Sequence, residues 1–117
     1  MAKHSEIGIK GEQIAADFLQ NKGYKILHCN WRSGKKEVDI VAATGNLMVF
    51  VEVKTRSSAS MLFPEETVNR KKQANLREAA EAFLAQNEDY KNVRFDIVSV
   101  LLSGEHIKEI IHFEEAF

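Results

Sequence analysis

Two acidic residues and a lysine are the side chains of this 117-residue chain whose types and spacing best suit chemistry. Asp39 lies in one β-like run and Glu52 lies in the next, and Lys54 follows Glu52 by two positions, on the same side of an extended strand. Carboxylates that share a site bind a hard cation or share a proton, and a nearby lysine neutralises them. Whether the three side chains meet depends on how the two runs pair.

The pairing is predicted by the turn between these runs. Gly45-Asn46 is typical of a two-residue β-hairpin turn, and it places Thr44 opposite Leu47. One face of the hairpin is then wholly apolar and belongs in the core: Val38 with Val53, Ile40 with Val51, and Ala42 with Val49. On the other face Asp39 lies opposite Glu52, and Glu37 lies opposite Lys54, with facing β-carbons about 4.5–5.5 Å apart.

Several arrangements account for two carboxylates placed side by side. Like charges repel, so a shared proton, a bound cation or the flanking Lys54 must compensate. A salt-bridged patch on a solvated sheet face is an equally good interpretation of the hairpin alone. A one-residue bulge would change the register altogether.

Two further charged residues lie on the predicted helices. Lys72, within an apolar helical stripe, either aims a cation over the sheet or packs its stem there. Glu12, at the border of another stripe, faces the sheet edge or water.

The elements that must position these groups are two helices and five strands. A helix is predicted over 5–22, with Ser5 as N-cap and Gly23 as its stop, and a second over 65–87, opened by Pro64. Their apolar stripes are Ile7, Gly11, Ile14, Ala15 and Phe18 in the first, and Val68, Leu76, Ala79, Ala80 and Phe83 in the second. Strands are predicted over 24–32, 37–43, 47–55, 93–102 and 106–113. Three consecutive strands favour antiparallel pairing, and the strand–helix–strand crossover favours one parallel pair. The predicted fold class is α/β: one domain over 1–117, a mixed β-sheet flanked by helices, in the order α-β-β-β-α-β-β.

Composition and charge narrow the functional classes. With 44% apolar residues, 28% charged residues and one cysteine, the chain is neither disordered nor a disulfide scaffold nor a Cys-based zinc protein. Its apolar runs are too short to cross a bilayer and its first residues lack a signal-peptide stretch, so we expect a cytoplasmic protein without a membrane partner. The net charge is −1, yet residues 22–77 carry eleven basic and five acidic residues. This asymmetry is compatible with a phosphate-rich partner, but charge alone favours a solvated mixed surface.

The spacing of Asp39 from Glu52-Val53-Lys54 resembles the PD-(D/E)XK nuclease signature, with Val38 in place of the usual proline. A wider pattern, over nearly the whole chain, resembles the YraN family: Gly11-Glu12, Gly23-Tyr24, Asn30, Arg32, Glu37 to Ala42, Val49 to Arg56, Lys72, Arg94-Phe95-Asp96 and Ala116-Phe117. This largely uncharacterised family is assigned a restriction-endonuclease-like fold and is similar in layout to archaeal Holliday-junction resolvases. Two departures bear on substrate contact: Lys35-Lys36 follow Gly34 before Glu37, and 57–63 is serine-rich where the family is glycine-rich.

The resemblance implies a metal-dependent nuclease that hydrolyses phosphodiester bonds in DNA, including branched structures. Asp39, Glu52 and the carbonyl of Val53 would hold Mg²⁺ or Mn²⁺, which activates a water and stabilises charge on the phosphate. Lys54 would orient or help deprotonate that water. Glu12 would bind a water of the metal shell or a second ion.

Phosphate contacts that give affinity without reading sequence are expected from basic residues: Lys72, Lys35, Lys36 and Arg56. Glu37 and Asp96 match family positions and are expected to support the site, Asp96 through a fold-supporting hydrogen bond or salt bridge or in catalysis. The alternative function is a non-catalytic nucleic-acid-binding or adaptor module that keeps the carboxylates for stability, which the near-neutral charge favours. Resolvase-like relatives pair, so a monomer and a homodimer both stay open.

Overall fold

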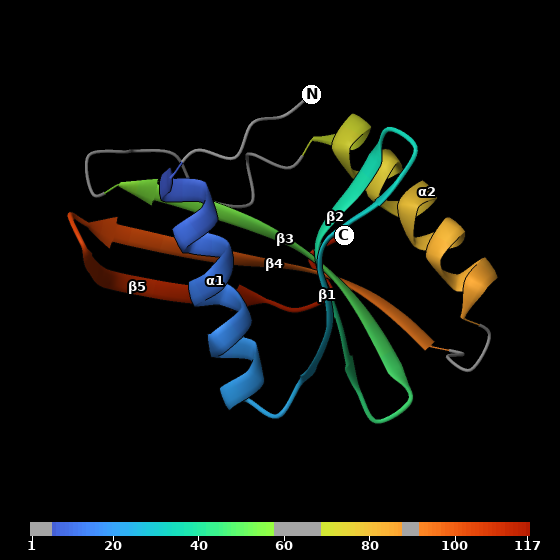
Figure 1. The fold of residues 1–117 in the computed structure, drawn as a ribbon, viewed down its shortest axis with the longest axis horizontal. Helices are drawn as coiled ribbons and strands as arrows, with labels where there is room; N and C mark the ends of the chain where they lie inside the picture. Colours follow the sequence, from blue (N-terminus) through green and yellow to red (C-terminus); the bar gives the residue numbers. More distant parts are fainter. Residues whose placement is uncertain (1–5, 58–68, 88–91) are drawn as a thin grey trace.

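The protein is a mixed five-stranded sheet with a helix on each face (Figure 1). A computed structural model describes residues 6–57, 69–87 and 92–117. The elements are α1 (Glu6–Asn21), β1 (Lys25–Ser33), β2 (Lys36–Thr44), β3 (Leu47–Ser57), α2 (Arg70–Gln86), β4 (Asn92–Ser103) and β5 (His106–Phe113). The strands lie side by side in chain order. β3 and β4 are parallel, and the other neighbours are antiparallel. The predicted class, a mixed sheet flanked by helices, is confirmed.

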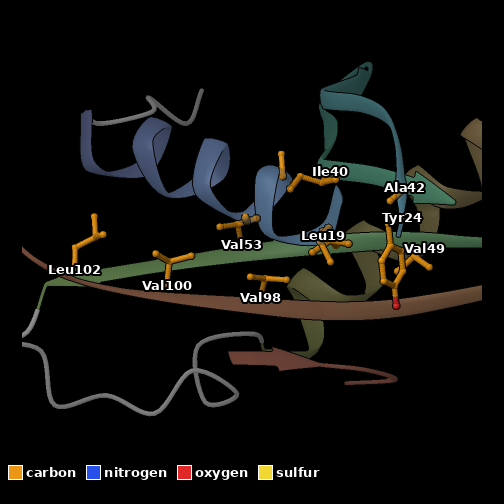
Figure 2. Packing of buried hydrophobic residues seen from close by; sticks show 12 residues of the cluster. Leu19, Tyr24, Ile40, Ala42, Val49, Val53, Val98, Val100 and Leu102 are labelled. Atoms are coloured by element: carbon orange, nitrogen blue, oxygen red, sulfur yellow. The ribbon is translucent and has the colours of Figure 1, made fainter. Parts of the chain in front are cut away.

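α1 packs on one face of the sheet, where its small residues let it approach closely. Gly11 is buried against Thr55 of β3, and a β-carbon at position 11 would clash with the Thr55 side chain. Figure 2 shows Val53, Val98 and Val100 pointing from the sheet toward this helix, in the cluster that includes Leu19. The predicted stop at Gly23 is confirmed by its φ of 99°, and Ser5 lies outside the described residues. Ile7 was predicted to be buried, but it is 51% exposed because the sheet-facing stripe begins at Gly11.

α2 covers the other face. Its predicted stripe from Leu76 to Phe83 is buried against residues of β2 and β3, including Val41 and Phe50. The helix begins at Arg70 and not at 65, because Asn69 is extended and its side chain accepts a hydrogen bond from the Lys72 N–H. Pro64 and Val68 lie outside the described residues. Neither helix in the described ranges has the length and apolar character needed to span a membrane.

β2 bends at Asp39, and this bend shapes the cavity described below. The predicted register holds from Thr44–Leu47 to Ile40–Val51, where the described ladder between β2 and β3 ends. The predicted pairs Val38–Val53, Asp39–Glu52 and Glu37–Lys54 are therefore wrong. Val38 packs in the α2-side cluster and Ile40 in the α1-side cluster, although the two residues are only two positions apart.

The cause of the bend lies in the neighbouring strand. Cys29 faces Ile40 and Trp31 faces Val38, so Asn30 lies opposite Asp39, and Asn30 has a φ of 54°. A residue in this left-handed conformation rotates the strand locally. The paired end of β1 and β2 consequently leaves the sheet and lies beside α2 (Figure 1).

Candidate metal and phosphate site

A cavity of about 640 Å³ lies where β2 has left β3, between the sheet, α2 and the β1–β2 hairpin. Its lining includes both predicted metal-binding carboxylates and three of the four predicted phosphate-binding cations. The lining residues are Arg32, Gly34, Lys35, Lys36, Glu37, Asp39, Glu52, Lys72, Asn75 and Leu76. The structure thus brings Asp39 and Glu52 to one cavity, although it does so through a bend and not through direct pairing.

Asp39 is fixed at the point where the two strands separate. Its Oδ2 accepts a hydrogen bond of 2.8 Å from the backbone N–H of Val53, which takes the place of a ladder bond from β2. The N–H and C=O of one residue in a strand point the same way. The Val53 carbonyl therefore points to the side where Asp39 lies, as the predicted ligand role requires.

The charge of Asp39 is poorly tolerated in the folded chain. Burial, followed by the nearby charge of Glu52, raises its pKa to about 8, with a smaller contribution from Glu12. The hydrogen bond from Val53 and the charge of Lys72 act in the opposite direction. At neutral pH this carboxyl group favours the protonated form, and a bound divalent cation would supply the positive charge that the ionised form needs.

Glu52 is held by two lysines. Its side chain is 8% exposed, and its Oε2 lies 2.6 Å from Lys72 Nζ and 3.6 Å from Lys54 Nζ. The salt-bridged interpretation of the sequence therefore describes part of what is seen, with Lys72 as the closer partner. Lys72 is the lysine in the apolar stripe of α2, and it does reach an anion over the sheet.

The two lysines differ in how readily they give up a proton. Burial, and then the neighbouring Lys72, lowers the pKa of Lys54. Burial alone would lower the pKa of Lys72 as well. The charge and hydrogen bond of Glu52, together with smaller contributions from Lys54 and Asp39, outweigh burial and raise that pKa above its ordinary value. Lys54 is accordingly the better proton acceptor, and Lys72 is the more permanent cation.

The donor set suits a hard divalent cation. Among the described residues there is no group of three or more His, Cys, Asp or Glu side chains arranged around one point, as a zinc site would need. Mg²⁺ and Mn²⁺ need fewer protein ligands, because Mg²⁺ is typically bound by one or two carboxylates together with waters and substrate phosphate. Asp39, Glu52 and the Val53 carbonyl fit that requirement.

Three other predicted site residues either lie outside the cavity lining or bind protein groups within it. Glu12 lies on α1, on the opposite face from α2, and Arg56 lies four positions beyond Glu52 on β3. Neither is among the described residues that line the cavity, although Glu12 still acts electrostatically on Asp39. Lys36 lines the cavity but binds protein groups: its Nζ donates to Asn75 Oδ1 at 2.9 Å and pairs with Glu78 at 3.3 Å.

Arg32 and Asn75 are cavity residues to which sequence reasoning gave no role. Arg32 pairs with Glu37 at 3.2 Å across the β1–β2 hairpin, which accounts for the supporting position of Glu37. Asn75 follows Lys72 by three positions, so helical spacing alone places the two on neighbouring parts of one helix face. The spacing from Lys72 could therefore have indicated Asn75 as a site residue. For Arg32, the position next to the hairpin turn could have done so.

Asp96 lies away from the cavity, on the α1 side of β4, and is fully buried. Arg94 donates two hydrogen bonds to it, each of 2.8 Å, and the backbone N–H of Glu115 donates a third of 3.1 Å. His112 Nε2 lies 2.7 Å from Asp96, and Lys22 Nζ lies 2.8 Å from His112 Nδ1. Because an ammonium group can only donate, Nδ1 accepts and Nε2–H donates to Asp96. The geometry gives Asp96 a structural role.

Comparison with known proteins identifies the family. The model of the uncharacterised protein family UPF0102 matches residues 11–100. The chain belongs to the UPF0102 family. UPF0102 is the YraN family, so the resemblance seen in the sequence is confirmed at this level.

Similar UPF0102 proteins come from several bacteria. The chain is 46% identical to the UPF0102 protein of Alkaliphilus oremlandii (strain OhILAs), over 97% of this chain and 99% of the relative. It is 43% identical to that of Porphyromonas gingivalis (strain ATCC 33277), over 100% and 87% of the two chains. The names of these relatives give only the family, so the similarity does not indicate a reaction or a substrate.

Proposed function

We propose that this UPF0102 protein is a metal-dependent nuclease of the restriction-endonuclease-like class that hydrolyses phosphodiester bonds in DNA. The observation that supports it most is that Asp39, Glu52 and Lys72 line one cavity, with Lys54 Nζ 3.6 Å from Glu52. Two carboxylates there can hold a cation, one lysine of lowered pKa can accept a proton, and a second can bind a phosphate oxygen.

Each residue has a distinct task in this proposal. Asp39 and Glu52, with the Val53 carbonyl, hold Mg²⁺ or Mn²⁺, and the bound cation supplies an activated water and neutralises charge at the phosphate. Lys54 orients that water and accepts its proton. Lys72, which pairs with Glu52 here, would be free to contact a phosphate oxygen if a cation neutralised Glu52, and Lys35 would contact a neighbouring phosphate.

Plasmid nicking tests the proposal. Wild-type protein with Mn²⁺ should convert supercoiled plasmid to open circles, and EDTA should abolish the conversion. Lys54→Ala should lower the nicking rate by about a hundredfold or more, in line with the loss of a general base. The matched control is Lys25→Ala, an exposed lysine at the far end of β1, which should nick as the wild type does. Equal nicking by Lys54→Ala and wild type would contradict the assignment.

A non-catalytic nucleic-acid-binding or adaptor module is the second candidate. It is favoured by the ion pairs of Glu52 with Lys72 and Lys54, which neutralise this carboxylate within the protein alone. A mobility shift of DNA without nicking, under every metal tested, would support the module. Nicking that depends on Lys54 would exclude it.

A further inference from the structure

We infer that the site accepts an unpaired strand of DNA and excludes the interior of a duplex. This inference rests on the proposed function and names its substrate class. Three features of the cavity carry it: the bridge between the hairpin and α2, the size of the space below, and the small number of cations around it.

The first feature is a contact that joins the two walls of the cavity. Lys36, at the start of β2, reaches across to α2, where it binds Asn75 at 2.9 Å and Glu78 at 3.3 Å. The hairpin and the helix are therefore tied together beside the carboxylates. The side chain of Glu52 is only 8% exposed, so a scissile phosphate has little room to approach it between walls joined in this way.

The second feature is the size of the space. Its volume of about 640 Å³ is that of a small-molecule site, which usually measures about 300–1,000 Å³. A few atoms of one backbone and a splayed nucleotide fit such a space. A double helix, whose major groove alone is about 12 Å wide, does not.

The third feature is the charge of the lining. Among the described residues, four basic and three acidic residues line the cavity. Three of these four cations already pair with carboxylates: Arg32 with Glu37, Lys36 with Glu78, and Lys72 with Glu52. Proteins that hold duplex DNA through its backbone make about 6–10 phosphate contacts. The cations here suffice for only a few phosphates next to the reacting one.

The test compares matched oligonucleotides. A labelled 20-nucleotide strand is offered alone, as a blunt duplex, and as a duplex with a ten-nucleotide overhang. Cleavage is followed with Mn²⁺, and binding is followed by fluorescence anisotropy in EDTA. We expect the single strand and the overhang to be cut and bound at least about tenfold better than the blunt duplex, a difference of about 1.4 kcal/mol. Cuts in the third substrate should lie in or beside the overhang.

A double variant tests the role of the bridge. Asn75→Ala with Glu78→Ala removes both partners of Lys36 and keeps a helix-favouring residue at each position. The ratio of duplex to single-strand cleavage should rise by about fivefold or more, about 1 kcal/mol. Glu81→Ala, an exposed acidic residue one turn further along α2, is the control and should leave the ratio unchanged.

The outcomes separate the inference from the proposed function. Equal or faster cleavage of the blunt duplex overturns the inference and leaves the nuclease intact. Absence of cleavage with every metal, together with preferred single-strand binding in EDTA, overturns the nuclease and supports the inference. Binding that favours the duplex in EDTA overturns the inference whatever the cleavage assay shows.

Discussion

At the scale of single residues, Asp39 is the group whose charge the fold tolerates least. Its pKa of about 8 compares with an ordinary value of 3.8, so the folded chain holds the proton more tightly than the unfolded chain between these values. The free energy of unfolding contributed by this group is complete below pH 3.8 and is lost as the pH rises toward 8. Metal-free protein should therefore be less stable at pH 8 than at pH 6.

Asp39→Asn tests this dependence. Asparagine keeps an oxygen that can accept the Val53 N–H and removes the charge beside Glu52. We expect the variant to be more stable than the wild type at pH 8 in EDTA, by on the order of 1–3 kcal/mol, and nearly equal to it at low pH. Urea unfolding at several pH values measures the difference. Asp17→Asn, an exposed carboxylate of α1, is the control; the same gain there would contradict the assignment.

The same variant tests the metal site. Mn²⁺ should bind the wild type with proton release, and more tightly as the pH rises, because the metal needs the ionised carboxylate. Asp39→Asn should lose most of the heat in a calorimetric titration. Equal weak binding by both proteins would exclude a divalent-ion site at Asp39.

At the scale of elements, the sequence predicted what local patterns determine. The alternation of Ile40 to Ala43 against Met48 to Val51, with Gly45-Asn46 between them, is enough to set their register. The bend at Asp39 is different, because it depends on the left-handed Asn30 of another strand and on the docking of the hairpin to α2. Long-range contacts of this kind leave no periodic signal. The sequence therefore predicted that Asp39 and Glu52 lie close together, but it gave the wrong geometry for their approach.

Gly11 is the residue that sets the distance between α1 and β3. A β-carbon at this position would clash with Thr55, so Gly11→Ala should lower the free energy of unfolding by about 1–3 kcal/mol. In an open helix the same change stabilises by about 1 kcal/mol, so the sign of the effect is decisive. Urea unfolding measures it, with Gln13→Ala on the exposed side of α1 as the control. A stabilised Gly11→Ala protein would contradict the close packing.

At the scale of the whole molecule, Asp96 joins parts of the chain that are distant in sequence. Burial would raise its pKa, but hydrogen bonds from His112 and Arg94 outweigh burial and hold the pKa below its usual range. The stability gained is therefore present at neutral pH and is lost as the pH falls below about 3.8. The sequence marked Asp96 only through a family pattern, because its partners other than Arg94 come from β5 and the segment after β5.

Asp96→Ala should be strongly destabilising. It leaves Arg94, whose side chain is 14% exposed, without its main partner, and the loss of one member of a buried pair costs about 3–5 kcal/mol. Glu114→Ala is the matched control, since Glu114 pairs with the same arginine at 3.4 Å but is 53% exposed. Its removal should cost less than about 1 kcal/mol. Similar losses for both variants, measured by urea unfolding, would show that the buried network is not the source of stability.

The distribution of charge over the molecule predicts how its binding to DNA responds to salt. With a net charge of −1 and four cations among the described residues that line the cavity, we expect the protein to neutralise only a few phosphates. For two to four contacts on a single strand, the slope of log K against log salt should be about −1.4 to −2.8. Lys35→Ala should make the slope shallower by about 0.7, which corresponds to one phosphate, whereas Lys25→Ala, at the far end of β1, should not change it. A slope steeper than about −5 would require an extended basic surface and would remove the reason for confining the substrate to one strand.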